Sequence, residues 1–230
     1  MNIPKLEEMM KAGMHFGHRT NRWHPKMEPF IFTKKNGIYI INLEKAQEQL
    51  KKALEFMIKL TKEDKAILFV GTKKQVKNSM KKMAEEAKVP YITGKWLGGF
   101  LTNFNVIKKS IKKYQDLIND RESGRLNKYT KKEKLDFDRE IKRLEERVGG
   151  LVGLIKLPDA IFIWDLKEEK TAIVEAQATG IPIIAVCDTN VDPSLCAYPI
   201  PANDDATKTV ELILNAIKDT LANAKNISLK

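Results

Sequence analysis

Apolar residues follow two different spacings along this 230-residue chain. Four short runs are rich in apolar residues, and a glycine or a proline lies near each: AILFVG (66–71), YI (91–92), AIFIWD (160–165) and IPIIAVCD (181–188). Amphipathic helices are expected near these runs, over about 74–88, 168–179 and 205–223. Buried strands that alternate with helices predict an α/β fold, in which a mostly parallel sheet has helices on both faces.

The first 60 residues follow another pattern. A short helix is expected to end at Gly13, and residues 29–42 (PFIFTKKNGIYIIN) predict two strands joined by a turn at Asn36-Gly37. An amphipathic helix should follow over 43–60. Near the other end of the chain, the proline-containing stretch 190–204 is expected to be a loop. The prediction for the N-terminal region is therefore a helix, a β-hairpin and a second helix.

A different spacing interrupts the α/β pattern. Apolar residues step by three and four positions along two runs, which are Phe104, Ile107, Ile111, Tyr114 and Ile118, then Phe137, Ile141, Leu144, Val148 and Leu151. Thr130 and Glu133 have the spacing of a capping box before the second run. The pattern predicts an inserted antiparallel coiled-coil helical hairpin over 103–151, and residues 1–102 and 152–230 would form the α/β domain. The lysines of the first helix of this hairpin have two interpretations, a binding surface or a solvated face.

Charge is distributed unevenly. Residues 1–150 carry 34 basic and 19 acidic side chains, whereas 151–230 carry 7 basic and 11 acidic ones. This basic front section favours a polyanionic partner, although a lysine-rich solubilising surface would give the same balance. The sequence has neither an apolar run of membrane-spanning length nor the features of a signal peptide, so no membrane partner is expected and the cytoplasm is the expected location. Two cysteines, Cys187 and Cys196, make a disulfide framework improbable.

All three histidines lie in MHFGHRTNRWHP (14–25). His15 and His18 have H-x-x-H spacing, so a divalent metal site is one interpretation, but further ligands would have to come from distant segments such as those carrying Asp188, Asp192, Asp204 and Asp205. A catalytic base is another interpretation, and no nucleophile accompanies it. We expect no cofactor.

Arginines and an aromatic residue around these histidines suit a third interpretation, which is contact with RNA. Arg19, Arg22, Trp23 and Lys26 can contact phosphates and stack on bases, and GKWLGGFLTNF (94–104) offers a similar mixture. In the second segment the candidates are Lys95, Trp96, Thr102 and Asn103. Either tryptophan has an alternative role as a core anchor.

The turn FVGTKKQ (69–75) joins a strand to a helix, a position that favours phosphate. It has one glycine, whereas a dinucleotide fingerprint has three, and it lacks the P-loop pattern. Gly71, Thr72, Lys73 and Lys74 would suit an RNA phosphate as well as a mononucleotide. A nucleotide-dependent enzyme is therefore the alternative function from another class.

These motifs occur together in one order: MHFGHRTNRWHPKMEPFIFTKKNGIYIINLEKA, FVGTKKQ, KWLGGFLTNF, LPDAIFIWD, EAQATGIPIIAVCDTNVDP and IPANDDA. Across nearly its full length the chain resembles the second protein of the bacterial small ribosomal subunit. The resemblance implies a flavodoxin-like or Rossmann-like domain with a protruding helical hairpin, which points to the bacterial or organellar branch. It implies a structural, non-enzymatic role without a small-molecule substrate.

The resemblance also implies partners and positions. The partners would be small-subunit ribosomal RNA, bound near the junction of head and body late in assembly, and neighbouring proteins. The neighbouring proteins include the large messenger-binding first protein of the subunit. RNA-facing positions would be His18, Arg19, Arg22, Trp23, Lys26, Thr72, Lys73, Lys74, Lys95, Trp96, Thr102 and Asn103. The chain departs from the family at Lys95, which is usually arginine, and at Cys196 and Ala197, where the setting is usually more polar.

Overall fold

The main sheet has five parallel strands in the order β5-β4-β6-β7-β8. The computed structural model describes residues 2–228, with side chains as far as Lys225. The strands are β4 (Ile67–Val70), β5 (Tyr91–Ile92), β6 (Ala160–Ile163), β7 (Ile183–Cys187) and β8 (Tyr198–Pro201). The second strand of this sheet in chain order, β5, lies at the edge outside the first, β4, which is the flavodoxin-like order. The predicted α/β class is confirmed.

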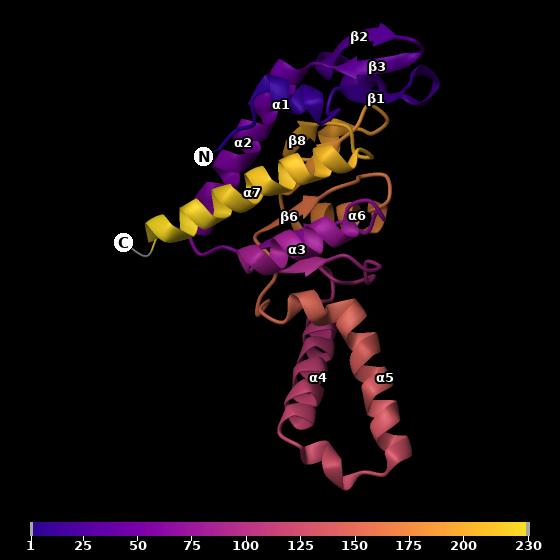
Figure 1. The fold of residues 1–230 in the computed structure, drawn as a ribbon, viewed down its shortest axis with the longest axis vertical. Helices are drawn as coiled ribbons and strands as arrows, with labels where there is room; N and C mark the ends of the chain where they lie inside the picture. The colour runs from indigo at the N-terminus through magenta and orange to yellow at the C-terminus, as the bar shows by residue number, and fades with distance from the viewer. Residues whose placement is uncertain (1, 229–230) are drawn as a thin grey trace.

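Helices cover both faces of this sheet (Figure 1). Helices α2 (Leu43–Lys62), α3 (Lys77–Ala87) and α7 (Thr207–Ser228) lie on one face, and α6 (Lys170–Thr179) lies on the other. Successive strand side chains point to opposite faces, so Phe69 packs in the first core and Leu68 in the second. Because both faces are covered, every residue of β4, β6 and β7 is buried.

One strand lies where the sequence predicted a loop. The stretch 190–204 contains a 3-10 turn at Pro193–Leu195 and then β8, so that prediction is wrong. Pro199 and Pro201 lie within β8, and proline has no N–H to donate to a neighbouring strand. The strand tolerates both prolines because it is at the edge of the sheet and pairs only with β7.

A small antiparallel sheet precedes the main one. Its strands are β1 (Phe16–Arg19), β2 (Ile31–Lys35) and β3 (Ile38–Ile41), in the order β1-β3-β2, after helix α1 (Leu6–Lys11). Asn36 and Gly37 have φ values of 51° and 75°, as a two-residue hairpin turn requires, so the predicted hairpin is confirmed. The strand β1 was not predicted, because FGHR contains a single large apolar residue. Short 3-10 turns follow it at Thr20–Arg22 and Pro25–Phe30.

The helical hairpin projects from the end of the molecule opposite the small sheet (Figure 1). It consists of α4 (Phe104–Glu122), α5 (Lys131–Val148) and 3-10 turns at Arg125–Lys128 and Gly149–Leu151. The predicted capping box is present, with Thr130 and Glu133 bonded to each other's backbone N–H.

The apolar seam of this hairpin is buried only in part. Ile107 and Leu144 are buried at the base in the same core as one face of the sheet, whereas Tyr114 and Phe137 are partly exposed nearer the tip. The division into two domains at 103 and 151 stays a prediction. No helix described within 2–228 is long and apolar enough to cross a bilayer.

Candidate functional site

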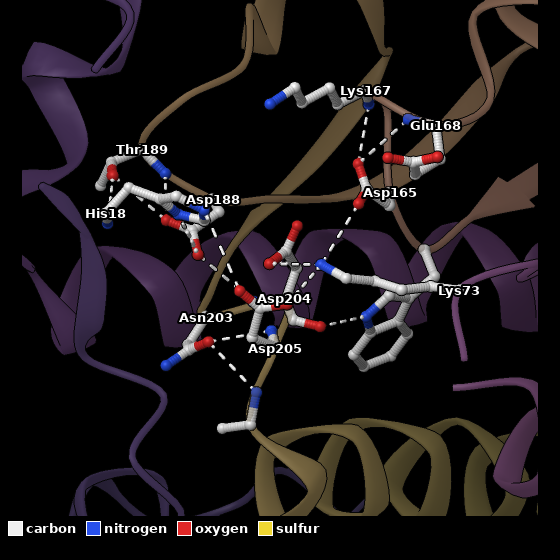
Figure 2. Close-up of polar contacts among 12 residues, drawn as sticks. His18, Lys73, Asp165, Lys167, Glu168, Asp188, Thr189, Asn203, Asp204 and Asp205 are labelled. Carbon is white, nitrogen blue, oxygen red and sulfur yellow. Dashed lines mark hydrogen bonds and ion pairs between the residues drawn. The ribbon is translucent and has the colours of Figure 1, made fainter. Parts of the chain in front are cut away.

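Charged side chains gather at the carboxyl ends of the parallel strands (Figure 2). Lys73 follows β4, Asp165 follows β6 and Asp188 follows β7, while Asp204 and Asp205 lie between β8 and α7. In flavodoxin-like sheets, this edge is where ligands bind, near the point at which the strand order reverses. Here that point lies between β4 and β6, so the fold places this polar cluster at the expected binding edge.

Lys73 is at the centre of the polar cluster (Figure 2). Its Nζ lies 2.7 Å from Asp205 Oδ1, 2.9 Å from Asp204 Oδ1 and 3.3 Å from Asp165 Oδ2, and its side chain is only 16% exposed. Burial disfavours the charged amine, but the attraction of these carboxylates outweighs burial and raises the pKa of Lys73. The ammonium group therefore neutralises carboxylates within the protein itself.

Asp204 is the most perturbed of these carboxylates. Burial, together with repulsion from Asp188 and Asp165, raises the pKa of Asp204 to about 7 despite the nearby Lys73. The buried Trp164 Nε1 donates to the backbone oxygen of Asp204 at 3.0 Å, which fixes the chain there. Part of the negative charge of the cluster can thus be removed by a proton near neutral pH.

His18 reaches the polar cluster from the small sheet. Its Nδ1 lies 3.1 Å from Asp188 Oδ2, and its Nε2 lies 4.0 Å from Asp205 Oδ2. The hydrogen bond to Asp188 raises the pKa of His18, against the opposing effect of burial. The backbone N–H of His18 also donates to Thr189 Oγ1 at 2.8 Å. The small sheet is therefore joined to the end of β7 by both side-chain and backbone contacts.

His18, Asp188 and Asp204 have the donor atoms of a divalent cation site. One donor atom from each lies within 4.8 Å of the others, and imidazole with carboxylates suits a divalent transition metal. His15 is absent from this group of described residues, and its ring packs on Phe16 with centroids 4.0 Å apart. His15 lies in the turn before β1, whereas His18 lies within the strand, and the two imidazoles do not share this group of donor atoms.

Arg19 and Arg22 line a hollow of about 430 Å³ beside His18, together with Asp188 and Asp205. Both arginines are exposed, and neither has an ion pair with any described residue. Trp23 is half-buried, with its ring 5.0 Å from that of Tyr39. The predicted guanidinium groups are thus available to an external partner.

Lys26, by contrast, is bound to the loop after β7. Its Nζ lies 2.7 Å from Asp192 Oδ2 and 2.8 Å from Ser194 Oγ. Burial would raise the pKa of Asp192, but the hydrogen bonds from Lys26 and Ser194 outweigh it and lower this pKa to about 2. The ammonium of Lys26 is exposed and already paired.

The turn after β4 contains two polar side chains bound within the protein, Thr72 and Lys73, and one that is unpaired among the described residues, Lys74. Thr72 donates to the buried Glu169 through both its backbone N–H and its hydroxyl group, so its hydroxyl is occupied within the protein. Burial raises the pKa of Glu169, although these bonds oppose the shift. Lys74 is exposed and has no ion pair with the described residues. Lys74 is therefore the free cation of this turn, whereas Lys73 is not.

The segment 95–103 is held by Glu175 of α6. The Glu175 carboxylate accepts hydrogen bonds from the Trp96 indole and from the backbone N–H groups of Gly99, Leu101 and Thr102. Trp96 is 8% exposed and packs against Phe100, so it is the core anchor of the alternative interpretation and not an open stacking surface.

Three polar residues of this segment remain accessible. Lys95, Thr102 and Asn103 are exposed, and Lys95 has no ion pair with a described residue. No hydrogen bond between described residues joins this segment to His18 or to the polar cluster. The structure thus brings together two of the three predicted segments and leaves the third separate.

Sequence reasoning missed the acidic residues that hold these segments. Asp165, Glu169 and Glu175 were not candidates, although Asp165 lies two positions after the buried strand β6, where the strand-end rule identifies ligand-facing positions. Glu175 had no such signal, because a glutamate on a helix is usually solvated.

Comparison with known proteins decides the family. A profile of the family described as ribosomal protein S2 matches residues 9–224. The chain belongs to the ribosomal protein S2 family. It is 46% identical to the small ribosomal subunit protein uS2 of Coprothermobacter proteolyticus over 96% of this chain and 82% of that protein. It is 44% identical to the protein of the same name from Chlorobium phaeovibrioides, over 100% of this chain and 90% of that one.

The chain is 43% identical to a third protein of this name, from Fusobacterium nucleatum, over 96% of this chain and 90% of that relative. The predicted resemblance is confirmed. Membership of the ribosomal protein S2 family makes the role of this chain structural and places it in translation, and the alternative of a nucleotide-dependent enzyme is wrong.

Proposed function

We propose that this protein is a component of the small ribosomal subunit that binds small-subunit ribosomal RNA near the junction of head and body, late in assembly. The observation that carries this proposal is the contrast between two classes of cations. Lys26 and Lys73 are neutralised by aspartates of the protein, whereas Arg19, Arg22 and Lys74 are unpaired among the described residues. The paired lysines hold the loops, and the unpaired cations face the RNA phosphates.

Lys95, Asn103 and Thr102 form a second contact in this proposal, on the segment that Glu175 holds. Trp23 offers a partly exposed aromatic ring beside the arginines. In this proposal Trp96 stabilises its segment from within the core, and His18 and Thr72 hold the loops in position. The ribosome of the cytoplasm or of an organelle is the proposed location.

The test is the affinity of the full-length protein for small-subunit RNA. Replacing Arg19 and Arg22 together by alanine should weaken binding at least tenfold. A matched control is Lys59→Ala/Lys62→Ala, which removes the same charge from the exposed end of α2, near the opposite edge of the sheet. Equal losses for the two double variants would mean that net charge, and not this surface, drives binding.

Neighbouring proteins of the subunit, including its large messenger-binding first protein, are the proposed partners of the hairpin. Val106 and Leu135 are about half exposed on α4 and α5, and exposed apolar side chains suit a protein contact better than a phosphate contact. Val106→Ser/Leu135→Ser leaves the buried base of the hairpin intact and should reduce association with subunit proteins while RNA affinity stays within twofold. Loss of RNA affinity instead would assign the hairpin to RNA.

A further inference from the structure

The loop between β7 and β8 has a cysteine close to each of its ends. Cys187 is the last residue of β7, and its Sγ lies 3.6 Å from Sγ of Cys196, just before β8. Both thiols are free. Bonded sulfurs lie about 2.05 Å apart, so an approach of about 1.5 Å would join them. We propose that Cys187 and Cys196 form an oxidation site, at which a hydroperoxide converts the two thiols into a reversible intramolecular disulfide.

Exposure decides which sulfur reacts first. Cys187 is 0% exposed and Cys196 is 9% exposed, next to Leu195 at 36%. Both residues are buried, and Cys196 is the more exposed of the two, so in this proposal a small oxidant reacts first at Cys196. The Cys196 thiol donates to the Pro193 carbonyl oxygen at 3.2 Å, and the Cys187 thiol lies 3.6 Å from the Ala185 carbonyl oxygen. These hydrogen bonds of the thiols are weak, so they oppose an approach of the two sulfurs little.

The reaction proceeds in two balanced steps. Cys196 Sγ attacks one peroxide oxygen, the O–O bond breaks, and Cys196 becomes a sulfenic acid while an alcohol leaves, or water in the case of hydrogen peroxide. Cys187 Sγ then attacks Cys196 Sγ, the S–S bond forms, and the S–O bond breaks with release of water that carries the Cys187 proton. Two thiols lose two electrons and two protons, and the hydroperoxide is reduced. A thiol reductant restores both thiols.

This disulfide would close the loop that holds the N-terminal segment. Between the two cysteines, the Thr189 carbonyl oxygen accepts from the His24 N–H at 2.8 Å, and Asp192 pairs with Lys26 at 2.7 Å. Joining the loop ends limits the conformations of the unfolded chain, so the oxidised protein should unfold at a higher temperature.

The test exposes the folded full-length protein to hydrogen peroxide, unfolds it, alkylates the remaining thiols and measures the mass. Peptide mapping is needed because the chain also has eight methionines that gain oxygen. We expect no alkylated cysteine, a mass lower by two hydrogens at the linked peptides containing Cys187 and Cys196, and return of both thiols after dithiothreitol.

Two variants separate the steps. Cys187→Ser should stop at a Cys196 sulfenic acid that dimedone labels, and Cys196→Ser should leave Cys187 unoxidised. The proposal is overturned if both wild-type thiols remain alkylatable after the exposure, or if Cys196 proceeds to sulfinic acid while Cys187 stays free.

Discussion

The Trp96 indole N–H donates to Glu175 Oε1 at 3.1 Å, and this contact joins the segment 95–103 to helix α6. Backbone N–H groups of Gly99 and Leu101 donate to the same carboxylate at 2.8 and 2.9 Å. Burial would raise the pKa of Glu175, but these donors outweigh it and lower the pKa. One carboxylate therefore satisfies several backbone donors of a segment that has no regular structure.

Glu175→Gln should destabilise the protein by about 3 kcal/mol, because the amide replaces one accepting oxygen with an NH₂ group that faces N–H donors. Urea unfolding at neutral pH measures the loss. The control Glu211→Gln changes an exposed glutamate on α7 and should cost less than about 0.5 kcal/mol. A similar small cost for both variants would show that Glu175 does not hold the segment.

Gly17→Ala should destabilise the contact between β1 and the end of β7. An added Cβ would lie 2.5 Å from Thr189 Cγ2, closer than packed atoms approach, and 3.0 Å from the Tyr39 carbonyl oxygen, which is a tight contact. We expect a loss of about 2 kcal/mol in the free energy of unfolding.

Thr189→Ser removes the nearer methyl group and should recover part of that loss in the double variant, so the pair gives a thermodynamic cycle. Gly153→Ala is the control, because an added Cβ there meets nothing within 4 Å. Strict additivity of the two changes at positions 17 and 189 would contradict the predicted clash.

The sequence predicted the elements better than it predicted the contacts between them. Buried strands such as 160–163 and the Asn36-Gly37 turn follow from local patterns, and the structure confirms both. Strand β8 was missed because its prolines are typical of loops, and only its edge position permits them. The pairing of Lys73 with Asp204 and Asp205 joins residues more than 130 positions apart, which no local spacing indicates. The internal pairing of the Lys73 ammonium could therefore not be predicted from the turn FVGTKKQ alone.

Lys73→Met should cost about 3 kcal/mol in stability, because removal of the ammonium leaves Asp165, Asp204 and Asp205 without their shared partner. Lys74→Met, one position along, removes an exposed and unpaired lysine and should cost little. Chemical unfolding of both variants at pH 7 makes the comparison. If Lys74→Met proved the more damaging of the two, the assignment of Lys73 to a structural role would be wrong.

Stability should fall between about pH 4 and pH 7 through the titration of Asp204. Its pKa is raised in the folded protein from 3.8 to about 7, so its contribution to stability is fully present below pH 3.8 and is lost as the pH rises through 7. Asp204→Asn cannot titrate and should flatten this part of the profile, whereas Asp138→Asn, at an exposed position, should not. Thermal unfolding at a series of pH values tests the difference, and identical profiles for the wild type and Asp204→Asn would refute the prediction.

RNA affinity should fall steeply with salt, because each phosphate that a protein cation contacts releases bound counterions. Four unpaired cations, Arg19, Arg22, Lys74 and Lys95, predict a slope of roughly −3 in a plot of log affinity against log salt concentration. Arg19→Ala should make that slope shallower by about 0.7.

Lys26→Met is the informative comparison, because the Lys26 ammonium is already paired with Asp192 at 2.7 Å and displaces few counterions from RNA. Its slope should stay close to that of the wild type even if its affinity falls through the loosened loop. A slope change for Lys26→Met as large as that for Arg19→Ala would mean that the ion pair opens in the complex, and Lys26 would then belong with the RNA-facing cations.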